Sequence, residues 1–390
     1  MGTTSVDVLV VGGGVHGASA TWHLARRGVD VLLVERGELA GGPTGRSSAV
    51  CRAYYTDPFL ARVAREALDV LASFAEHTGG RDAGFHPTGG LFLHGPADVG
   101  VVTRTAAALS AIGTATDLLT PAELTERFPR LALDGVACAA YEHGAGYADP
   151  VLTTTGMVGH ARDLGARVRL RSEVVGLDVH GGTGRGVTVG LADGTRVAAG
   201  RVLLAAGPWT GRLARLVGAS LPLTVERHVV ATFATGGTDH LDVVMADVPG
   251  GYYVKPETGG TLLAGPLTPE PAIDDPDTLD ERIHDAEVAA LGTALVRRVP
   301  DLAAAQPRGG WASLYDVSPD WQPVIGEIAP GVVVDAGTSG HGFKLAPALG
   351  GYVAGLVLGE ADPGLAAFHP DRFAAGGGLA AGYGEARILG

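Results

Sequence analysis

The sequence predicts a two-domain protein of mixed α/β and α+β class, in which a helix-flanked parallel sheet is interleaved with an antiparallel sheet. Three observations predict it. Residues 6–37 read as strand, glycine turn, helix and second strand, whereas residues 221–264 read as short alternating strands without helices between them. Residues 331–358 return to a buried strand followed by a helix. With 390 residues, 46% of them apolar, the chain can bury two cores.

The first unit carries a glycine pattern with a chemical meaning. Gly12 lets the chain turn tightly after an apolar run, Gly14 lets the backbone approach a pyrophosphate, and Gly17 lets helix and strand pack closely. The N–H groups at the helix start then bind the anion. Glu35 ends the second strand, where its carboxylate can accept both ribose hydroxyls of an adenosine and disfavours a 2′-phosphate. The unit predicts a Rossmann-like dinucleotide site.

The next segments alternate between loop, helix and strand. A small-residue loop over 37–48 is too long to be a simple connector. An apolar stripe at helical spacing predicts a helix over 58–77, and a strand is expected over 85–94. Helices are predicted over 97–113 and over 121–128, the latter opened by Thr-Pro-Ala-Glu.

The middle and end of the chain supply the remaining elements of the parallel sheet and of the antiparallel sheet. A helix over 151–164 is followed by strands, a hairpin, the short alternating strands, an acidic helical segment and the closing strand and helix. The expected ranges are strands 167–179, 186–191, 195–199, 201–206, 223–232, 243–246, 252–255 and 261–264, a segment over 274–300 that is acidic and then helical, strand 331–336 and helix 345–358. We therefore assign 1–86, 146–220 and 323–390 to the first domain, and 87–145 and 221–322 to the second.

Charge and composition narrow the partners. A net charge of −13 argues against a nucleic-acid or anionic-membrane surface, and no apolar run reaches about 18 residues without a charge or a loop signal. The glycine turn lies so near Met1 that we expect no cleaved signal and a cytoplasmic protein. Cys51 and Cys138 lack metal-ligand spacing, so we interpret them as buried thiols and expect no metal site.

Several separated segments, in this order, resemble the D-amino-acid-oxidase superfamily of FAD enzymes. They are the N-terminal unit and residues 44–52, 205–209, 311–326 and 337–344. Within the superfamily the chain is most similar to the branch of sarcosine oxidase and dimethylglycine dehydrogenase, and it also resembles glycine oxidase. The resemblance implies a Rossmann-like FAD-binding domain of the GR2 type, with the flavin ring beneath an antiparallel sheet that carries the substrate pocket.

Motif and resemblance together predict the contacts to FAD. Ser47 and Ser48 are small hydroxylated residues suited to a loop around pyrophosphate and flavin edge, and the glycines after residue 339 allow the backbone to approach the flavin. His341 is equally well explained as a helix-entry residue. The predicted contacts are Gly12, Gly14, Val15, His16, Gly17, Glu35, Arg36, Arg46, Ser47, Ser48, Val174, Ala206, Gly207, Trp209, Gly340, His341, Gly342, Phe343 and Lys344.

For the substrate, the resemblance assigns three residues. Arg52 and Lys344 match the two cations that clamp the substrate carboxylate in the sarcosine-oxidase branch. A fork and an ammonium in a dry pocket would orient the substrate for reaction. Tyr315 stands where that branch has a pocket tyrosine and where glycine oxidase and D-amino-acid oxidase have an arginine, which argues against a D-amino-acid oxidase.

Two departures from the branch bear on the flavin. Ser313 occupies the position of the cysteine that bonds the flavin in monomeric sarcosine oxidase, so FAD is expected to be non-covalent. Leu263 replaces the lysine that assists oxygen activation there, and Lys255 is a hypothetical substitute. Oxidase and dehydrogenase both stay open, with O2 the favoured electron acceptor.

We therefore expect an FAD-dependent amine oxidoreductase acting on a small or N-substituted amino acid. Hydride passes to the flavin and water hydrolyses the resulting imine, so an N-carboxymethyl amine would give glyoxylate and a free amine. One alternative is an FAD-dependent 2-hydroxy-acid dehydrogenase, because a carboxylate clamp serves a hydroxy acid equally well. The other is a flavin-bearing subunit of a larger electron-transfer complex.

Overall fold

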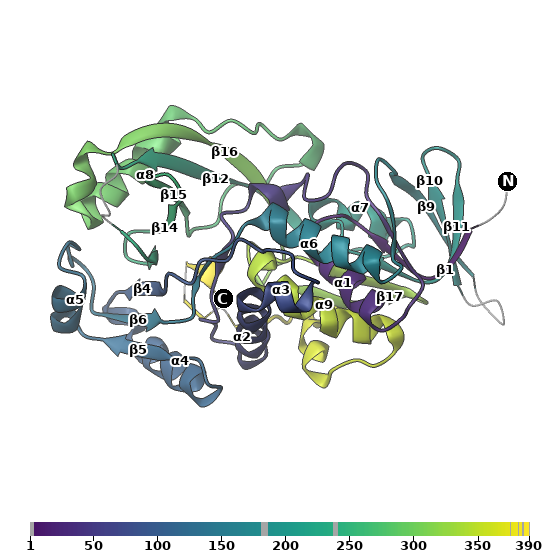
Figure 1. Cartoon of the computed structure of the whole chain (residues 1–390), viewed down its shortest axis with the longest axis horizontal. Coiled ribbons are helices and arrows are strands. Elements are labelled where there is room, and N and C mark those ends of the chain that lie inside the picture. The colour runs from purple at the N-terminus through teal and green to yellow at the C-terminus, as the bar shows by residue number, and fades with distance from the viewer. Residues whose placement is uncertain are drawn as a thin grey trace.

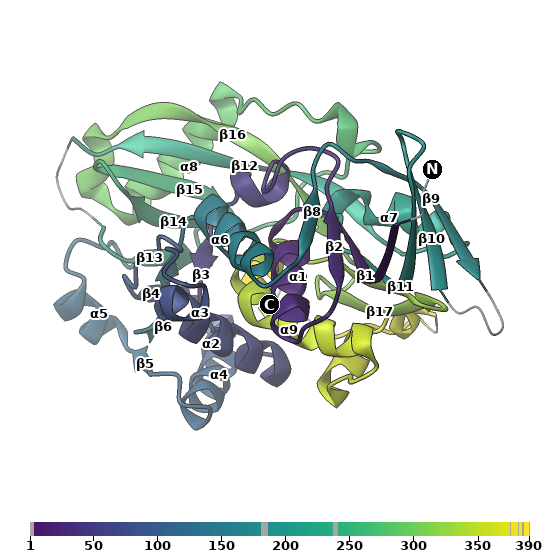
Figure 2. The same cartoon turned by 45° about the vertical axis from the view of Figure 1, so that its right-hand side comes forward.

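The computed structural model describes residues 4–180, 186–236, 241–374, 376–380, 382–383 and 386–389. Two large sheets dominate it (Figure 1), with the antiparallel sheet to the left and the helix-flanked sheet to the right. We call the second one the α/β sheet. Figure 2 shows helices α1 and α9 packed in the middle of the molecule, next to the α/β sheet.

The α/β sheet has the strand order β17-β18-β11-β1-β2-β8, with β10 and β9 added beside the first half of β11. Strand β1 lies between β11 and β2 and is parallel to both. The strands are β1 (Thr4–Val11), β2 (Val31–Val34), β8 (Arg167–Arg169), β9 (Val174–His180), β10 (Gly186–Leu191), β11 (Arg196–Leu204), β17 (Val324–Ala329) and β18 (Val332–Ala336).

Alternation along β1 explains why this strand is apolar on both faces. Val8 and Val10 belong to the core shared with the helices, whereas Leu9 and Val11 belong to a separate core with residues of β9 and β10. The helices on the first face are α1 (Val15–Arg26), α2 (Pro58–Ala72), α6 (Pro150–Asp163) and α9 (Gly342–Leu358).

Helices α1 and α9 cross closely. The Ser19 hydroxyl donates to the Ala346 carbonyl at 2.6 Å, and a Cβ on Gly350 would lie 2.2 Å from that hydroxyl oxygen. Both helices begin just after a strand of the α/β sheet, α1 after β1 and α9 after β18. Their N-termini therefore meet at the same edge of the sheet, which is where this class of fold binds ligands.

The antiparallel sheet has the order β16-β12-β15-β14-β13-β4-β6-β5, with one parallel pair, β13 and β4. Its strands come from the ranges 87–145 and 221–322. They are β4 (Gly90–His94), β5 (Thr116–Leu119), β6 (Cys138–Glu142), β12 (Thr224–Ala234), β13 (Val244–Asp247), β14 (Tyr252–Glu257), β15 (Thr261–Pro266) and β16 (Gln306–Val317). Helix α8 (Asp285–Arg298) packs on β12, β14, β15 and β16.

Shorter elements complete the described chain. Strands β3 (Val50–Cys51) and β7 (Gly146–Tyr147) form a small antiparallel pair. The remaining helices are α3 (Phe74–His77), α4 (Val99–Ala111), α5 (Pro121–Arg127) and α7 (Thr210–Arg215), and the turns of 3₁₀ helix include η1 (Pro43–Arg46), η3 (Gly207–Trp209) and η4 (Pro276–Thr278).

Several predicted boundaries were wrong. The helix expected over 58–77 breaks at Ser73, whose backbone is not helical, into α2 and α3. The strand expected over 167–179 is interrupted because Arg171 adopts a φ of +51°, which separates β8 from β9. Only 90–94 of the strand expected over 85–94 is extended as a strand, and α9 begins at Gly342 rather than at 345.

The two strands expected over 195–199 and 201–206 are the single strand β11. Its first half pairs with β10 and its second half with β18, so the change of neighbour falls at Gly200 without breaking the strand. Strands β5, β6, β16 and β17 were not predicted as strands at all.

No helix among the described residues is long and apolar enough to cross a membrane. No group of three or more His, Cys, Asp or Glu side chains in the described chain is arranged to hold a metal ion. Cys51 and Cys138 are both buried free thiols.

Candidate cofactor and substrate site

A cavity of about 960 Å³ lies between the two sheets. It is lined at one end by the turn after β1, the end of β2 and the start of β9, and at the other by β4, β12, β13 and β16. This volume is at the upper end of ordinary ligand pockets, so the cavity is large enough for a dinucleotide together with a small substrate.

The turn between β1 and α1 forms a cradle that only glycine can build. Gly12 has a φ of +113°, and a Cβ there would lie 2.4 Å from the Ala205 carbonyl oxygen. A Cβ on Gly17 would lie 1.9 Å from the Gly12 oxygen, so this glycine serves the close packing of helix on strand. The Thr44 hydroxyl accepts from the Val15 N–H at 3.1 Å, a contact that the sequence did not predict. The cradle of bare backbone at a helix start fits a pyrophosphate.

Glu35 lies at the end of β2, as expected for a ribose contact. One of its carboxylate oxygens accepts from the Gly13 N–H and the other from the Gly37 N–H, each at 2.6 Å. A carboxylate oxygen has two acceptor positions, so each can also take a ribose hydroxyl. The donor and acceptor set around Gly12 and Glu35 thus suits the adenosine and pyrophosphate of FAD.

His16 joins the starts of the two central helices. Its Nδ1 lies 2.8 Å from Oδ2 of Asp335 and its Nε2 lies 3.0 Å from the Gly342 carbonyl oxygen. Burial alone would lower the pKa of His16, but the Asp335 carboxylate outweighs it and holds that pKa above its ordinary value. In the protonated form both ring nitrogens can donate, one to each of these acceptors, and the imidazolium forms an ion pair with Asp335 beside the cavity.

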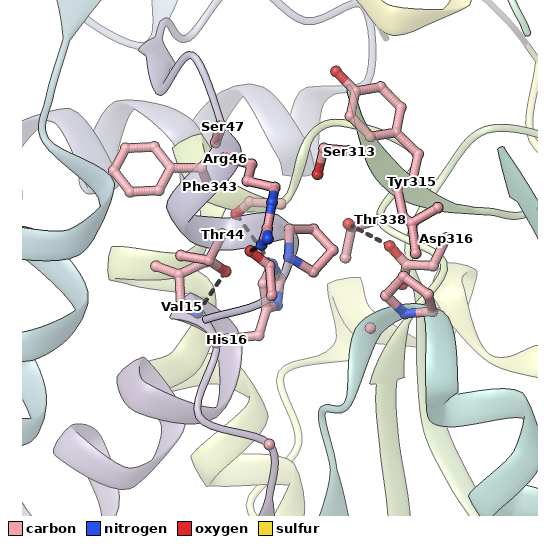
Figure 3. Close-up of a pocket in the computed structure, with 18 of the residues that line it drawn as sticks. Val15, His16, Thr44, Arg46, Ser47, Ser313, Tyr315, Asp316, Thr338 and Phe343 are labelled. Atoms are coloured by element: carbon pink, nitrogen blue, oxygen red, sulfur yellow. Dashed lines mark hydrogen bonds between the residues drawn. The ribbon is translucent and has the colours of Figure 1, made fainter. Parts of the chain in front are cut away.

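Residues from distant segments face this region of the cavity from several sides. Figure 3 labels Val15, His16, Thr44, Arg46, Ser47, Ser313, Tyr315, Asp316, Thr338 and Phe343 around it. The Thr338 hydroxyl donates to Asp316 at 3.1 Å, which ties the loop before α9 to strand β16.

At the far end of the cavity two cations are buried close to one another. Arg52 is 3% exposed and donates through Nη2 to the Ile388 carbonyl at 2.9 Å and through Nη1 to the Tyr54 carbonyl. The Lys344 ammonium donates to the Gly340 carbonyl at 3.2 Å. Burial and the Arg52 charge hold the pKa of Lys344 well below its ordinary value. Among the described residues neither cation forms an ion pair with a carboxylate.

Tyr315 packs against His228, which the sequence did not predict, and against the predicted site residue Gly340. Its ring stacks on His228, with centroids 3.9 Å apart and planes 18° apart, and His228 Nε2 lies 3.0 Å from Glu226. A Cβ on Gly340, whose φ is +80°, would lie 2.5 Å from the tyrosine ring. The glycine before α9 is therefore required for the close approach of this loop to β16.

Apolar side chains form part of the cavity wall. Phe92 and Ile388 lie beside Arg52, and Val244, Ala246, Leu267 and Leu389 line the same cavity. Nothing in the sequence distinguishes these residues, because an apolar residue that faces a cavity has the same sequence pattern as a core residue.

Most predicted site residues meet at this one cavity. Its walls include every predicted contact except Gly17 and His341. The imidazole of His341 is buried and lies 3.1 Å from the Tyr55 hydroxyl through Nδ1. Ser313 lines the cavity and, being a serine, offers no thiol to the flavin.

Lys255 lies outside the cavity wall. Its ammonium pairs with Glu257 at 2.8 Å, lies 3.8 Å from the centre of the Tyr147 ring, and is buried. It is the cross-strand partner of Leu263, so the two side chains share one face of the sheet. Glu257 lies two residues further along the same strand, and the ion pair directs the Lys255 ammonium toward it.

Comparison with known proteins agrees with this geometry. A family model described as "FAD dependent oxidoreductase" (DAO) matches residues 7–356. The chain is 28% identical to monomeric sarcosine oxidase of Streptomyces avermitilis, over 95% of this chain and 98% of that protein. It is 29% identical to glycine oxidase of Geobacillus kaustophilus, over 91% and 93%. Its fold matches the crystal structure of L-proline dehydrogenase from P. horikoshii with a TM-score of 0.87 and 24% identity, covering 97% of this chain and 100% of that one.

Proposed function

This chain belongs to the DAO family of FAD-dependent oxidoreductases, and from that premise we propose that it oxidises the C–N bond of a small or N-substituted amino acid. FAD, when bound, supplies the two-electron acceptor for such an oxidation. Two relatives at 28% and 29% identity are a sarcosine oxidase and a glycine oxidase, which supports an amino-acid substrate.

The observation that carries the proposal is the pair of buried cations, Arg52 and Lys344. Two positive charges held together out of water destabilise one another, and an anion between them removes that cost. Arg52 uses one N–H of each Nη nitrogen on backbone carbonyls, and the guanidinium has further N–H groups that no described residue engages. A substrate carboxylate satisfies both cations and is held in one orientation.

The rest of the pocket fits the other end of such a substrate. The cavity wall beside Arg52 includes the apolar residues Phe92 and Ile388, which favour an uncharged amine carrying a small apolar side chain or N-substituent. The neutral amine is the form that gives up hydride. The imine product is hydrolysed by water, so an N-carboxymethyl amine would yield glyoxylate and the freed amine.

We propose O2 as the electron acceptor and FAD as non-covalently held. The position of Ser313 on the cavity wall supports the second point, because a serine cannot form the thioether made by a cysteine. Denaturing the purified holoenzyme should release all of its flavin into the filtrate. Flavin that stays with the precipitated chain would contradict this.

The decisive experiment is an anaerobic titration of the holoenzyme, followed by the absorbance of oxidised flavin. The probes are sarcosine, glycine, proline, pipecolate, N-carboxymethyl amino acids and 2-hydroxy acids. Bleaching by one or more of the amino acids, with none from the hydroxy acids, is the expected result, and reoxidation on readmitting air identifies O2 as acceptor. Bleaching by a 2-hydroxy acid alone would replace the proposal by the hydroxy-acid dehydrogenase.

A variant of Lys344 tests the carboxylate clamp separately from the class of substrate that reduces the flavin. Because Lys344 is also a predicted FAD contact, Lys344→Met is assayed saturated with FAD, and we expect its bleaching to need far more substrate. If that variant is reduced at wild-type substrate concentrations, the carboxylate clamp is wrong even where the substrate class is right.

A further inference from the structure

A long connection within the antiparallel half of the chain reaches across to the α/β half at the adenosine end of the cavity. Residues 267–284 link β15 to α8 with only η4 as regular helix within them, and loops of this length without structure of their own are usually functional. Pro276, Asp277, Leu279 and Glu281 of this connection line the cavity. We call residues 275–281 the strap.

The strap is fixed at both ends to the antiparallel sheet. Before it, the Ile273 N–H donates to the Val225 carbonyl of β12 at 2.7 Å. At its other end, the Ala312 N–H of β16 donates to the Glu281 carbonyl at 2.8 Å, and Arg227 donates through Nε to the Asp280 carbonyl at 3.1 Å. Both anchors therefore belong to the same sheet.

The middle of the strap is held by the opposite side of the cavity. The Asp277 carboxylate accepts from Arg36 at 3.0 Å, from the Trp209 indole N–H at 2.8 Å and from Arg212 at 2.6 Å. Arg212 also donates to Asp275. These donors follow β2 and β11 of the α/β sheet. Figure 2 shows the green chain of this region extending from the antiparallel sheet toward α7, the helix that carries Arg212.

A second contact extends the same bridge. Arg46 of η1 donates to Glu281 at 2.6 Å, and the Trp311 indole N–H of β16 donates to the Arg46 carbonyl at 2.7 Å. The Arg36 guanidinium stacks on Trp209, with Cζ 3.9 Å from the ring centre. Three of the residues that the sequence assigned to FAD, Arg36, Arg46 and Trp209, are thus held by the strap.

We propose that the strap is a latch over the adenosine end of the FAD site, and that the Asp277 contacts must break before FAD can leave. Glu35, the predicted ribose contact, directly precedes Arg36, and Val174, the predicted adenine contact, lines the same cavity. The proposal rests on FAD binding, which the family membership gives, and not on the identity of the substrate.

The latch stays charged at any ordinary assay pH. Burial by itself would raise the pKa of Asp277, but hydrogen bonds from Arg212, Trp209 and Arg36 lower that pKa to about 2. The contacts lie near the surface, where salt screens them, so added salt weakens the latch.

The test compares two carboxylates of the same segment. Asp277→Asn removes the charge that bridges the cavity, whereas Asp280→Asn removes an equal charge whose partners are Arg282 and His284 of its own segment. FAD release from each holoenzyme is followed by the rise of free-flavin fluorescence after dilution. We expect release from Asp277→Asn to be about three- to ten-fold faster than from wild type, and release from Asp280→Asn to be unchanged.

The dependence of FAD release on salt concentration provides a second measurement. Wild-type release should accelerate as ionic strength rises, and Asp277→Asn should lose most of that acceleration. Equal release from the two variants, or a wild-type rate that salt does not alter, would overturn the latch. Either result leaves the proposed substrate untouched, because reduction of bound flavin is measured separately.

Discussion

The two ends of the cavity differ in how their charges are balanced. At the adenosine end the cations Arg36 and Arg212 are paired with Asp277, and Glu35 is occupied by backbone N–H groups. At the far end Arg52 and Lys344 are buried together without a carboxylate partner among the described residues. At the adenosine end the charges of the two arginines are therefore balanced by protein carboxylates before any ligand binds. At the far end the charges of Arg52 and Lys344 are balanced when an anion binds. Affinity for cofactor and affinity for substrate should therefore respond to separate residues.

The largest effect that separates the two ends is expected from Lys344→Met. The variant removes the partner of the substrate carboxylate from a buried, hydrogen-bonded charge pair. Such a loss costs roughly 2–5 kcal/mol, or about 30- to 5,000-fold in kcat/KM for an amino-acid substrate. The same substitution removes a buried charge that Arg52 repels, so the free energy of unfolding should stay equal or rise. Steady-state kinetics and thermal unfolding measure the two quantities.

Arg52→Lys is the companion variant for that comparison. It keeps the charge but loses the fork that bonds the Tyr54 and Ile388 carbonyls, so both activity and stability should fall. A Lys344→Met protein that loses stability while keeping kcat/KM would show that Lys344 supports the fold and does not bind the substrate carboxylate.

The next effect belongs to the opposite end. Glu35→Ala removes the acceptor of two backbone N–H groups and of the ribose, so we expect FAD affinity to fall by about 10- to 100-fold. The KM for substrate in the FAD-saturated variant should be unchanged. Fluorescence titration of the apoprotein with FAD measures the first quantity, and a parallel rise of KM would show that the two ends are coupled.

A smaller effect is expected from pH on the binding of propionate, a carboxylate without an amine. Because burial and Arg52 lower the pKa of free Lys344, its charge is lost as pH rises through that lowered pKa, and propionate should bind more weakly above it. Burial also raises the pKa of nearby Glu142 to about 7, and its ionisation acts in the same direction. Glu142→Gln removes that contribution, and Lys344→Met should remove the rest.

The smallest effect is predicted for Lys255→Met. The ammonium is directed to Glu257 and the side chain is not part of the cavity wall, so flavin reduction and its reoxidation by O2 should stay at wild-type rates. Glu257 is partly exposed and can be hydrated, which limits the loss of stability to about 1 kcal/mol. A marked slowing of reoxidation by O2 would instead give Lys255 the role suggested by its position beside Leu263.

The sequence predicted those parts of the fold and site that depend on residues close together along the chain. Gly12 and Glu35 belong to one local unit, so their spacing indicated both the turn and the end of β2. Asp277 and His228 could not be found this way, because each acquires its meaning from a partner on another segment, Trp209 or Tyr315. Strand β16 was missed as a strand because its first part is exposed and carries two glycines of positive φ, which hides the usual alternation.

The interleaving of the two sheets also constrains how the chain is made. Strand β1 pairs with β11 almost two hundred residues later, and β18 completes the sheet only after the whole antiparallel sheet has been synthesised. Contacts of such sequence separation close slowly, so the ribosome releases nearly the entire polypeptide before the sheet is complete. Until then the sheet lacks β17 and β18 and helix α1 lacks its partner α9, and a chaperone that shields the exposed apolar surface should raise the yield of folded protein.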